Sequence, residues 1–253
     1  MFPCCKSDTT DQEPPLPINF QSTQSKPHKQ ALNDNTSQPA FELDHSVFDT
    51  VDLSYFNLNA KQLELLKSKG VYDFRASSAE LMGTEPNRIE RDRIEGVYKC
   101  IAQVSQGKLN GKAHFQFNDG NFFIGTFKED NLDGTGVAFH TNGDYFTGRF
   151  KNNLREEGTL YCANGDQYQG AFKGDLYNGQ GKLTYRTKKV YEGGFQMGLK
   201  SGEGIMQWPD GAWYNGGYKE DKQHGFGTYV DSTGNKYEGE FEAGVLTERS
   251  RAK

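Results

Sequence analysis

A five-residue motif that recurs at a nearly fixed interval limits what this chain can fold into more than any other feature. The motif reads aromatic, variable, glycine, variable, aromatic, as in the segment that starts at Tyr237. Earlier copies start at Phe123, Phe146, Tyr168, Tyr191 and Tyr214, with steps of 23, 22, 23, 23 and 23 residues up to Tyr237. Such a period predicts a tandem array with one supersecondary unit per repeat.

Glycine is periodic in the second half of each repeat as well. Paired glycines stand 11 and 13 residues after the start of four repeats, at Gly134 and Gly136, Gly179 and Gly181, Gly202 and Gly204, and Gly225 and Gly227. A turn sequence containing glycine, such as Asn142-Gly143, then ends most repeats, whereas the fourth has Thr187-Lys188. A degenerate first copy starts at Cys100 and has Ala102 in the glycine position.

The glycine content of the array excludes helices and predicts strands. Residues 97–244 hold 27 of the 30 glycines, and each glycine inside a helix costs up to about 1 kcal/mol. Two short antiparallel strands per repeat, joined by turns, fit this pattern. The fold class predicted is therefore mainly β, an elongated single-layer antiparallel ribbon of tandem β-hairpins.

The segments that flank the array have different compositions. Residues 1–45 carry six of the eight prolines and few apolar side chains, which predicts a disordered tail. Residues 46–96 are predicted to form a small helical cap or linker, with one helix over Ala60–Lys69 that aligns Leu63 and Leu66. A further short helix is expected around Ile89, and residues 245–253 are expected to be a C-terminal tail.

The repeats resemble the MORN repeat family, whose units read roughly Tyr-Glu-Gly-x-Phe, then His-Gly-x-Gly and a closing Asp-Gly. Residues 100–244 carry this resemblance in six copies and a partial seventh, and His224-Gly225-Phe226-Gly227 matches the second half most fully. The resemblance implies a ribbon of hairpins and a non-enzymatic module of ciliary, cytoskeletal or membrane-junction assemblies. It also links such arrays to phosphoinositides.

Side-chain alternation predicts two different faces for the ribbon. The motif aromatics and glycines share one face, and a ring from a neighbouring strand is expected to lie flat over each motif glycine. The other face, with Thr147, Arg149, Glu192 and Glu238, is expected to be solvated. Because no segment is large enough to cover the whole aromatic face, we expect a groove for a partner helix or extended peptide. The residues predicted to line it are Tyr185, Trp208, Trp213, Tyr214 and Tyr229.

Several classes of function are disfavoured by the sequence. The array carries 16 Lys and Arg against 18 Asp and Glu, a balance of −2, which disfavours nucleic-acid binding. No histidine is spaced with Cys or carboxylates as in a metal site, and the repeated glycines do not join a strand to a helix as a phosphate-binding loop would. We therefore expect no catalytic residues, metal or cofactor.

The function predicted is a non-enzymatic protein-interaction scaffold, in a cytoplasmic and ciliary or cytoskeletal setting. The alternative is a peripheral membrane tether that binds phospholipid. Adjacent Cys4 and Cys5 could be acylated, although ordinary thiols on a tail are the simpler explanation, since cysteine alone is a weak lipidation motif. The chain has no apolar run of the roughly 20 residues that span a bilayer and no secretory signal pattern.

Overall fold

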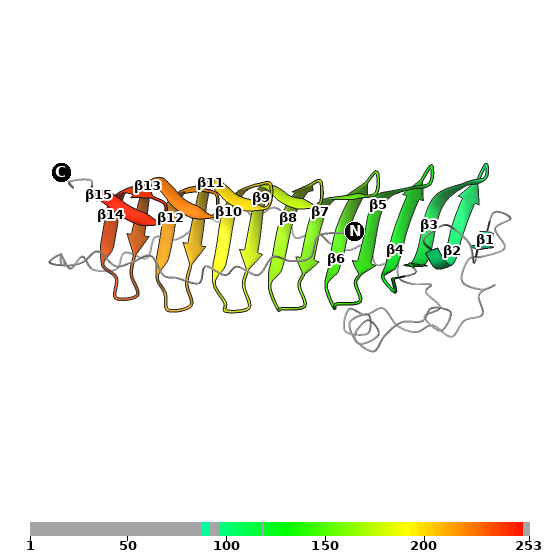
Figure 1. Cartoon of the computed structure of the whole chain (residues 1–253), viewed down its shortest axis with the longest axis horizontal. Helices are drawn as coiled ribbons and strands as arrows, with labels where there is room; N and C mark the ends of the chain where they lie inside the picture. The colour runs from blue at the N-terminus through cyan, green and yellow to red at the C-terminus, as the bar shows by residue number, and fades with distance from the viewer. Residues whose placement is uncertain (1–87, 92–96, 118, 250–253) are drawn as a thin grey trace. The chain divides into compact units, whose positions relative to one another are not determined.

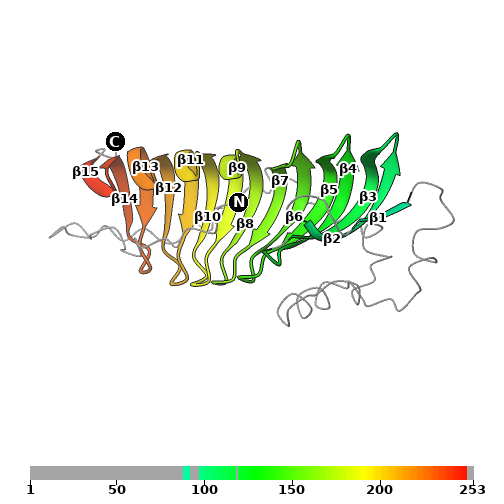
Figure 2. The same ribbon diagram turned by 45° about the vertical axis from the view of Figure 1, so that its right-hand side comes forward.

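The computed structural model describes residues 88–91, 97–117 and 119–249, and every regular element among them is a β-strand. Two compact units divide the chain between Ala163 and Asn164. In each unit, consecutive strands lie side by side in chain order (Figure 1). The turned view in Figure 2 shows no second layer of strands or helices over the sheets among the described residues.

The first unit holds seven strands, and each pairs antiparallel with the next. Their bounds are β1 Arg88–Arg91, β2 Val97–Ser105, β3 Lys108–Phe117, β4 Phe122–Lys128, β5 Asn131–Phe139, β6 Tyr145–Lys151 and β7 Leu154–Tyr161.

The second unit holds eight strands with the same antiparallel pairing. Their bounds are β8 Gln167–Lys173, β9 Leu176–Thr184, β10 Val190–Gln196, β11 Leu199–Gln207, β12 Trp213–Lys219, β13 Lys222–Val230, β14 Lys236–Glu242 and β15 Val245–Arg249. The predicted fold class, an open single-layer array of antiparallel hairpins, is confirmed.

One repeat is one hairpin, and the hairpins are joined by two kinds of turn. Within a repeat, a two-residue turn joins the motif strand to the second strand, and both central residues have positive φ, as at Glu220 and Asp221. This is the geometry that suits the twist of a hairpin. Between repeats, longer loops place a glycine at positive φ, as at Gly143 and Gly211. In the fourth repeat, Lys188 takes that conformation, with φ 70°.

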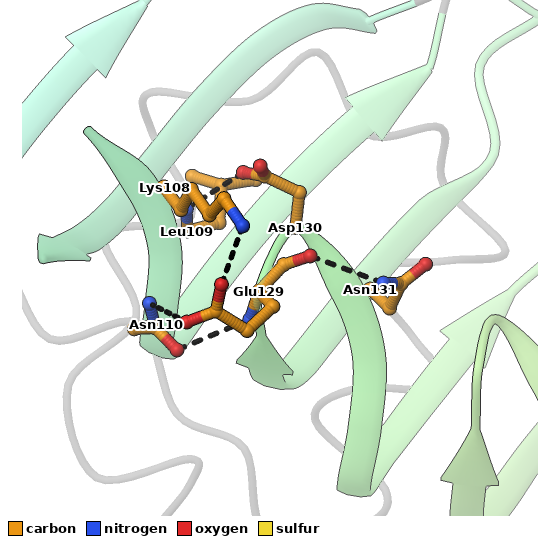
Figure 3. A network of polar contacts seen from close by, with 6 residues as sticks. All are labelled: Lys108, Leu109, Asn110, Glu129, Asp130 and Asn131. Atoms are coloured by element: carbon orange, nitrogen blue, oxygen red, sulfur yellow. Dashed lines mark hydrogen bonds and ion pairs between the residues drawn. The ribbon is translucent and has the colours of Figure 1, made fainter. Parts of the chain in front are cut away.

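The two-residue turns also form hydrogen bonds to the preceding hairpin. The Asp130 carboxylate accepts a hydrogen bond from the Leu109 amide at 2.7 Å (Figure 3). The Asp130 amide in turn donates to the Leu109 carbonyl at 3.1 Å. Asn153 makes the same two bonds to Leu132, and Asp221 makes them to Lys200. A polar side chain in the turn therefore locks neighbouring repeats in register.

The longer loops form a second set of hydrogen bonds between consecutive repeats, at the other end of the strands. Asp144 accepts a hydrogen bond from the Ala163 amide at 2.7 Å, and Asp166 accepts one from the Arg186 amide at 2.8 Å. Each carboxylate thus satisfies a backbone donor in the loop of the next repeat. Because both ends of the strands carry such bonds, each repeat is held in place by its neighbours along the array.

Two sequence predictions fail inside the described residues. Arg88–Arg91 is strand β1 and not helix, because it pairs with β2, from Arg88 opposite Gln103 to Arg91 opposite Cys100. Val245–Arg249 is strand β15 and not a tail, because it pairs with β14. The predicted helix over Ala60–Lys69 and the predicted tail over 1–45 lie outside the described residues.

Candidate partner-binding surface

The face that carries the motif glycines, hereafter the glycine face, is built from rings that lie over glycine. Cβ atoms added to Gly193 and Gly204, which are paired across β10 and β11, would stand 2.8 and 2.4 Å from the Tyr191 hydroxyl oxygen. Tyr168 and Tyr214 cover their own glycine pairs in the same way. The ring therefore belongs to the same strand as the motif glycine, not to a neighbouring strand as the sequence had suggested.

In the later repeats the tyrosine hydroxyl completes the arrangement. The register slips by one residue after the motif glycine, between Gly193 and Phe195. The Tyr191 hydroxyl donates to the Gly194 carbonyl at 2.9 Å. Tyr168 donates to Ala171 and Tyr214 to Gly217 with the same spacing. Tyrosine at the first motif position thus satisfies a carbonyl at the bulge, which phenylalanine in the earlier repeats cannot do.

The second motif aromatics join the first ones into a continuous row of edge-to-face contacts. Tyr191 meets Phe195 at 5.2 Å between ring centroids and Tyr218 at 4.9 Å, with interplanar angles of 88° and 78°. Tyr214 repeats this geometry with Tyr218 and Phe241. All five rings are buried. The row is the hydrophobic core of a one-layer sheet, stabilised by ring pairs worth about 0.5–1.5 kcal/mol each.

The five residues predicted to line a groove do not share one surface. Tyr214 is fully buried over Gly216 and Gly227, so its ring belongs to the core. Trp213 is half-buried on the opposite face, because neighbouring strand residues point to opposite sides. Tyr185, Trp208 and Tyr229 do lie on the glycine face.

Trp208 and Tyr229 form a cluster with Tyr237, a motif aromatic that the sequence analysis had not placed in the groove. Trp208 meets Tyr229 edge to face at 6.0 Å, and Tyr229 stacks on Tyr237 at 6.0 Å with an interplanar angle of 26°. Trp208 and Tyr237 are half-buried, whereas Tyr229 between them is buried. Tyr229 and Tyr237 are paired across β13 and β14, and this pairing could have identified Tyr237 as a member of the cluster. We call these three residues the tryptophan cluster.

A rigid loop adjoins the tryptophan cluster. The Asp231 carboxylate accepts hydrogen bonds from the Thr233 and Asn235 amides, each at 2.9 Å, and the Tyr237 hydroxyl lies 3.4 Å away. Burial alone would raise the pKa of Asp231, but the hydrogen bonds from Thr233 and Asn235 lower it to about 2. The carboxylate is therefore ionised at neutral pH and fixes the loop beside the cluster.

Tyr185 lies among ammonium groups, not in an open apolar surface. The Lys189 Nζ atom stands 4.3 Å from the centre of its ring, and the Lys200 Nζ atom donates to its hydroxyl at 3.2 Å. Tyr185 and both lysines are buried. Cation–π contacts of this kind stabilise the folded loop by about 0.5–2 kcal/mol.

The remaining residues considered in the sequence analysis are the histidines and the N-terminal cysteines. Within residues 88–91, 97–117 and 119–249, no group of three or more His, Cys, Asp and Glu side chains could hold a metal ion. His114 is buried on the opposite face, and His224 is exposed on β13. None of the described segments forms a helix suited to crossing a membrane. Cys4 and Cys5 lie outside the described residues.

Comparison with known families identifies the repeats. The MORN repeat model matches residues 100–122, 123–145, 146–167, 168–189, 191–213 and 214–236, six consecutive copies that span more than half of the chain. Each of the six matches starts at the first residue of a motif copy. No curated protein sequence matches the chain significantly.

Solved structures that align with the chain are distant. The TCP domain of Drosophila melanogaster SAS-4 (dCPAP), in complex with a proline-rich motif of Ana2 (dSTIL), has 11% identity and a TM-score of 0.35, over 65% of this chain and 97% of that domain. A variant TCP10 domain of Danio rerio CPAP has 12% identity and a TM-score of 0.26, over 70% of this chain and 93% of that domain. At such scores the properties of those domains do not transfer to this chain.

Proposed function

Because this chain belongs to the MORN repeat family, we propose that it is a non-enzymatic scaffold that holds a helix or an extended peptide of a partner protein against the glycine face of its repeats. The observation that carries the proposal is the tryptophan cluster of Trp208, Tyr229 and Tyr237. These half-buried and buried rings sit on the glycine face beside a loop that is fixed by internal hydrogen bonds.

The cluster has the physical character of a binding hot spot. Aromatic side chains supply large contact areas with few rotatable bonds, and Trp and Tyr dominate measured interface energies. Tyr229 is packed between Trp208 and Tyr237, so little conformational entropy remains to be lost on binding. We propose Trp208 and Tyr237 as the contact residues, with Tyr229 as their support and Tyr185 at the next loop along the same face.

A matched pair of tryptophans tests the proposal. Trp208 and Trp213 belong to the same repeat and are both half-buried, but they lie on opposite faces. Proximity labelling in the native cell, with the full chain, should recover the same neighbours for wild type and Trp213→Ala. Trp208→Ala should lose those that bind the cluster directly. An unchanged set of neighbours with Trp208→Ala at equal expression would refute this site.

The setting of the scaffold is a separate proposal. The family resemblance alone favours a ciliary or cytoskeletal assembly, and localisation of a tagged full chain would test it. The alternative, a peripheral membrane tether, rests on Cys4, Cys5 and the same resemblance. Flotation with phosphoinositide-containing liposomes, with and without Cys4→Ser and Cys5→Ser, distinguishes an acyl anchor from binding by the array. The absence of flotation for the protein purified from its native cell would refute the tether.

A further inference from the structure

The face opposite to the glycine face differs between the two units. In the first unit, ten positions on β3 to β7 form two cross-strand rows on this face. One row is Gln116, Phe122, Phe139, Tyr145 and Tyr161, and the other is His114, Ile124, Val137, Thr147 and Thr159. Nine of these ten residues are buried, with Ile124 at 0% and Phe122 and Phe139 at 1% exposure.

The corresponding rows of the second unit contain no buried residue. They run across β8 to β14 and include charged or amide side chains such as Glu192, Gln207 and Asn215, which are exposed. The same motif position is thus Thr147 at 5% exposure in one repeat and exposed Asn215 in another. The sequence prediction of a solvated face is correct for Glu192 and wrong for Thr147.

A one-layer sheet cannot bury both of its faces by itself. The rings of the glycine face reach zero exposure by lying over glycines. Ile124 is paired with His114 and Val137 and has no glycine to lie over, and sheet side chains stand roughly perpendicular to the layer, so its zero exposure requires a cover. The described residues supply no such cover, since all their strands belong to the sheets. Burial of these rows therefore requires a cover that the described residues do not supply.

We propose that residues 46–87 of this chain dock on the opposite face of β3 to β7, with the helix predicted over Ala60–Lys69 lying along the two rows. Of the residues outside the described ranges, only 1–87 are numerous enough to form a layer. Within them, 1–45 hold six of the eight prolines, whereas 46–87 hold closely spaced apolar side chains such as Leu53, Tyr55, Phe56, Leu63 and Leu66.

Connectivity and dimensions fit this occupant. Residue 87 leads directly into β1, which pairs with β2, and β2 pairs with β3, where the buried rows begin. Five strands at about 4.8 Å spacing give rows about 19 Å long, and two rows on one face lie about 7 Å apart. A ten-residue helix is about 15 Å long and about 10 Å wide with its side chains, so one helix covers most of both rows.

The buried polar residues of the face agree with a dry interface. Burial, with a smaller effect from the charge of Lys112, lowers the pKa of His114 to about 4. An imidazole that stays neutral at physiological pH can lie against an apolar helix at little electrostatic cost. This docking is independent of the proposed partner site, which is on the glycine face.

Photo-crosslinking in the full chain identifies the occupant. Phe139 and Gln207 stand at equivalent positions in their repeats, and Phe139 is buried whereas Gln207 is exposed. With Phe139→p-benzoylphenylalanine, we expect intramolecular cross-links to peptides from 46–87. Gln207→p-benzoylphenylalanine should give at least about tenfold fewer of them. In the Phe139 variant, adding Leu63→Asp and Leu66→Asp should reduce the yield by a similar factor while the β-sheet circular dichroism is retained.

Each other outcome overturns the proposal. Cross-links from position 139 into 1–45 would show that this segment, and not 46–87, covers the face. Cross-linked dimers would show that a second copy of the chain covers it. Equal cross-linking from positions 139 and 207 would mean that the face is not selectively covered. Yields that do not respond to Leu63→Asp and Leu66→Asp would place a different part of the chain on the rows.

Discussion

Replacing Gly204 by alanine should destabilise the array by about 2–4 kcal/mol, because the new methyl group would collide with the Tyr191 ring. Its Cβ atom would stand 2.4 Å from the Tyr191 Oη atom and 2.6 Å from Cε2 and Cζ. Carbon contacts are normally about 3.5–4.0 Å, so the ring must move by about 1 Å. That shift costs about 1–3 kcal/mol of overpacking and about 1 kcal/mol for the Tyr191–Gly194 hydrogen bond.

A double-mutant cycle isolates the collision from other effects of the substitution. Leucine lacks all three of the Tyr191 atoms that the new methyl group would meet, so Gly204→Ala should cost about 1–3 kcal/mol less in a Tyr191→Leu background. Gly202→Ala is the control, since its Cβ meets no atom within 4 Å and its cost comes from φ +78°. That cost should be the same in both backgrounds.

The assay is urea unfolding of the full chain, followed by far-UV circular dichroism and by hydrogen exchange of peptides from β10 and β11. Local exchange is needed because a repeat array need not unfold in one step. The ring-over-glycine explanation would be refuted if Gly204→Ala cost the same free energy in the wild-type chain and in the Tyr191→Leu background.

Three further outcomes follow from the structure. Asp221→Ala should destabilise the second unit by about 1–2 kcal/mol in urea unfolding, because it removes the acceptor for the Lys200 amide, whereas Asp221→Asn should be nearly neutral, as Asn153 fills this role elsewhere. Because the pKa of His114 falls from 6.5 to about 4 on folding, its contribution to stability is complete above pH 6.5 and decreases as the pH falls toward 4. His114→Gln should flatten the stability–pH curve between pH 6.5 and 4, and an unchanged slope would show that His114 does not cause this pH dependence. Tyr214→Phe should lose about 1 kcal/mol with its hydrogen bond to Gly217, and no change in the urea midpoint would show that the bond contributes nothing.

The hairpin array could be predicted from the sequence because its cause is local and repeated. Each motif places a ring two residues before a glycine, and each closing loop needs a residue that tolerates positive φ, as at Gly143 and Gly211. The paired glycines were recognised, but their different roles were not. Gly202 provides positive φ in open space, whereas Gly204 makes room for a ring.

The features that could not be predicted depend on contacts between repeats or with other segments. Asp130 and Asp221 look like ordinary turn residues until the register places them beside Leu109 and Lys200. The solvated face was assigned from Arg149 and Glu192, although the apolar residues at alternate positions of the first repeats indicated that part of this face is buried. Trp213 was placed in the groove by its type, whereas its position next to Tyr214 already assigns it to the other face.

The first and the last described strands, β1 and β15, have a property that bears on backbone pairing with other chains. β1 has four residues, three of them charged, and β15 has five residues, ending in Glu248 and Arg249. Short, charged terminal strands are poor templates for intermolecular backbone pairing, which long and apolar edges invite. Pairing of another chain on β1 or on β15 is therefore less favourable than pairing on a long, apolar strand would be.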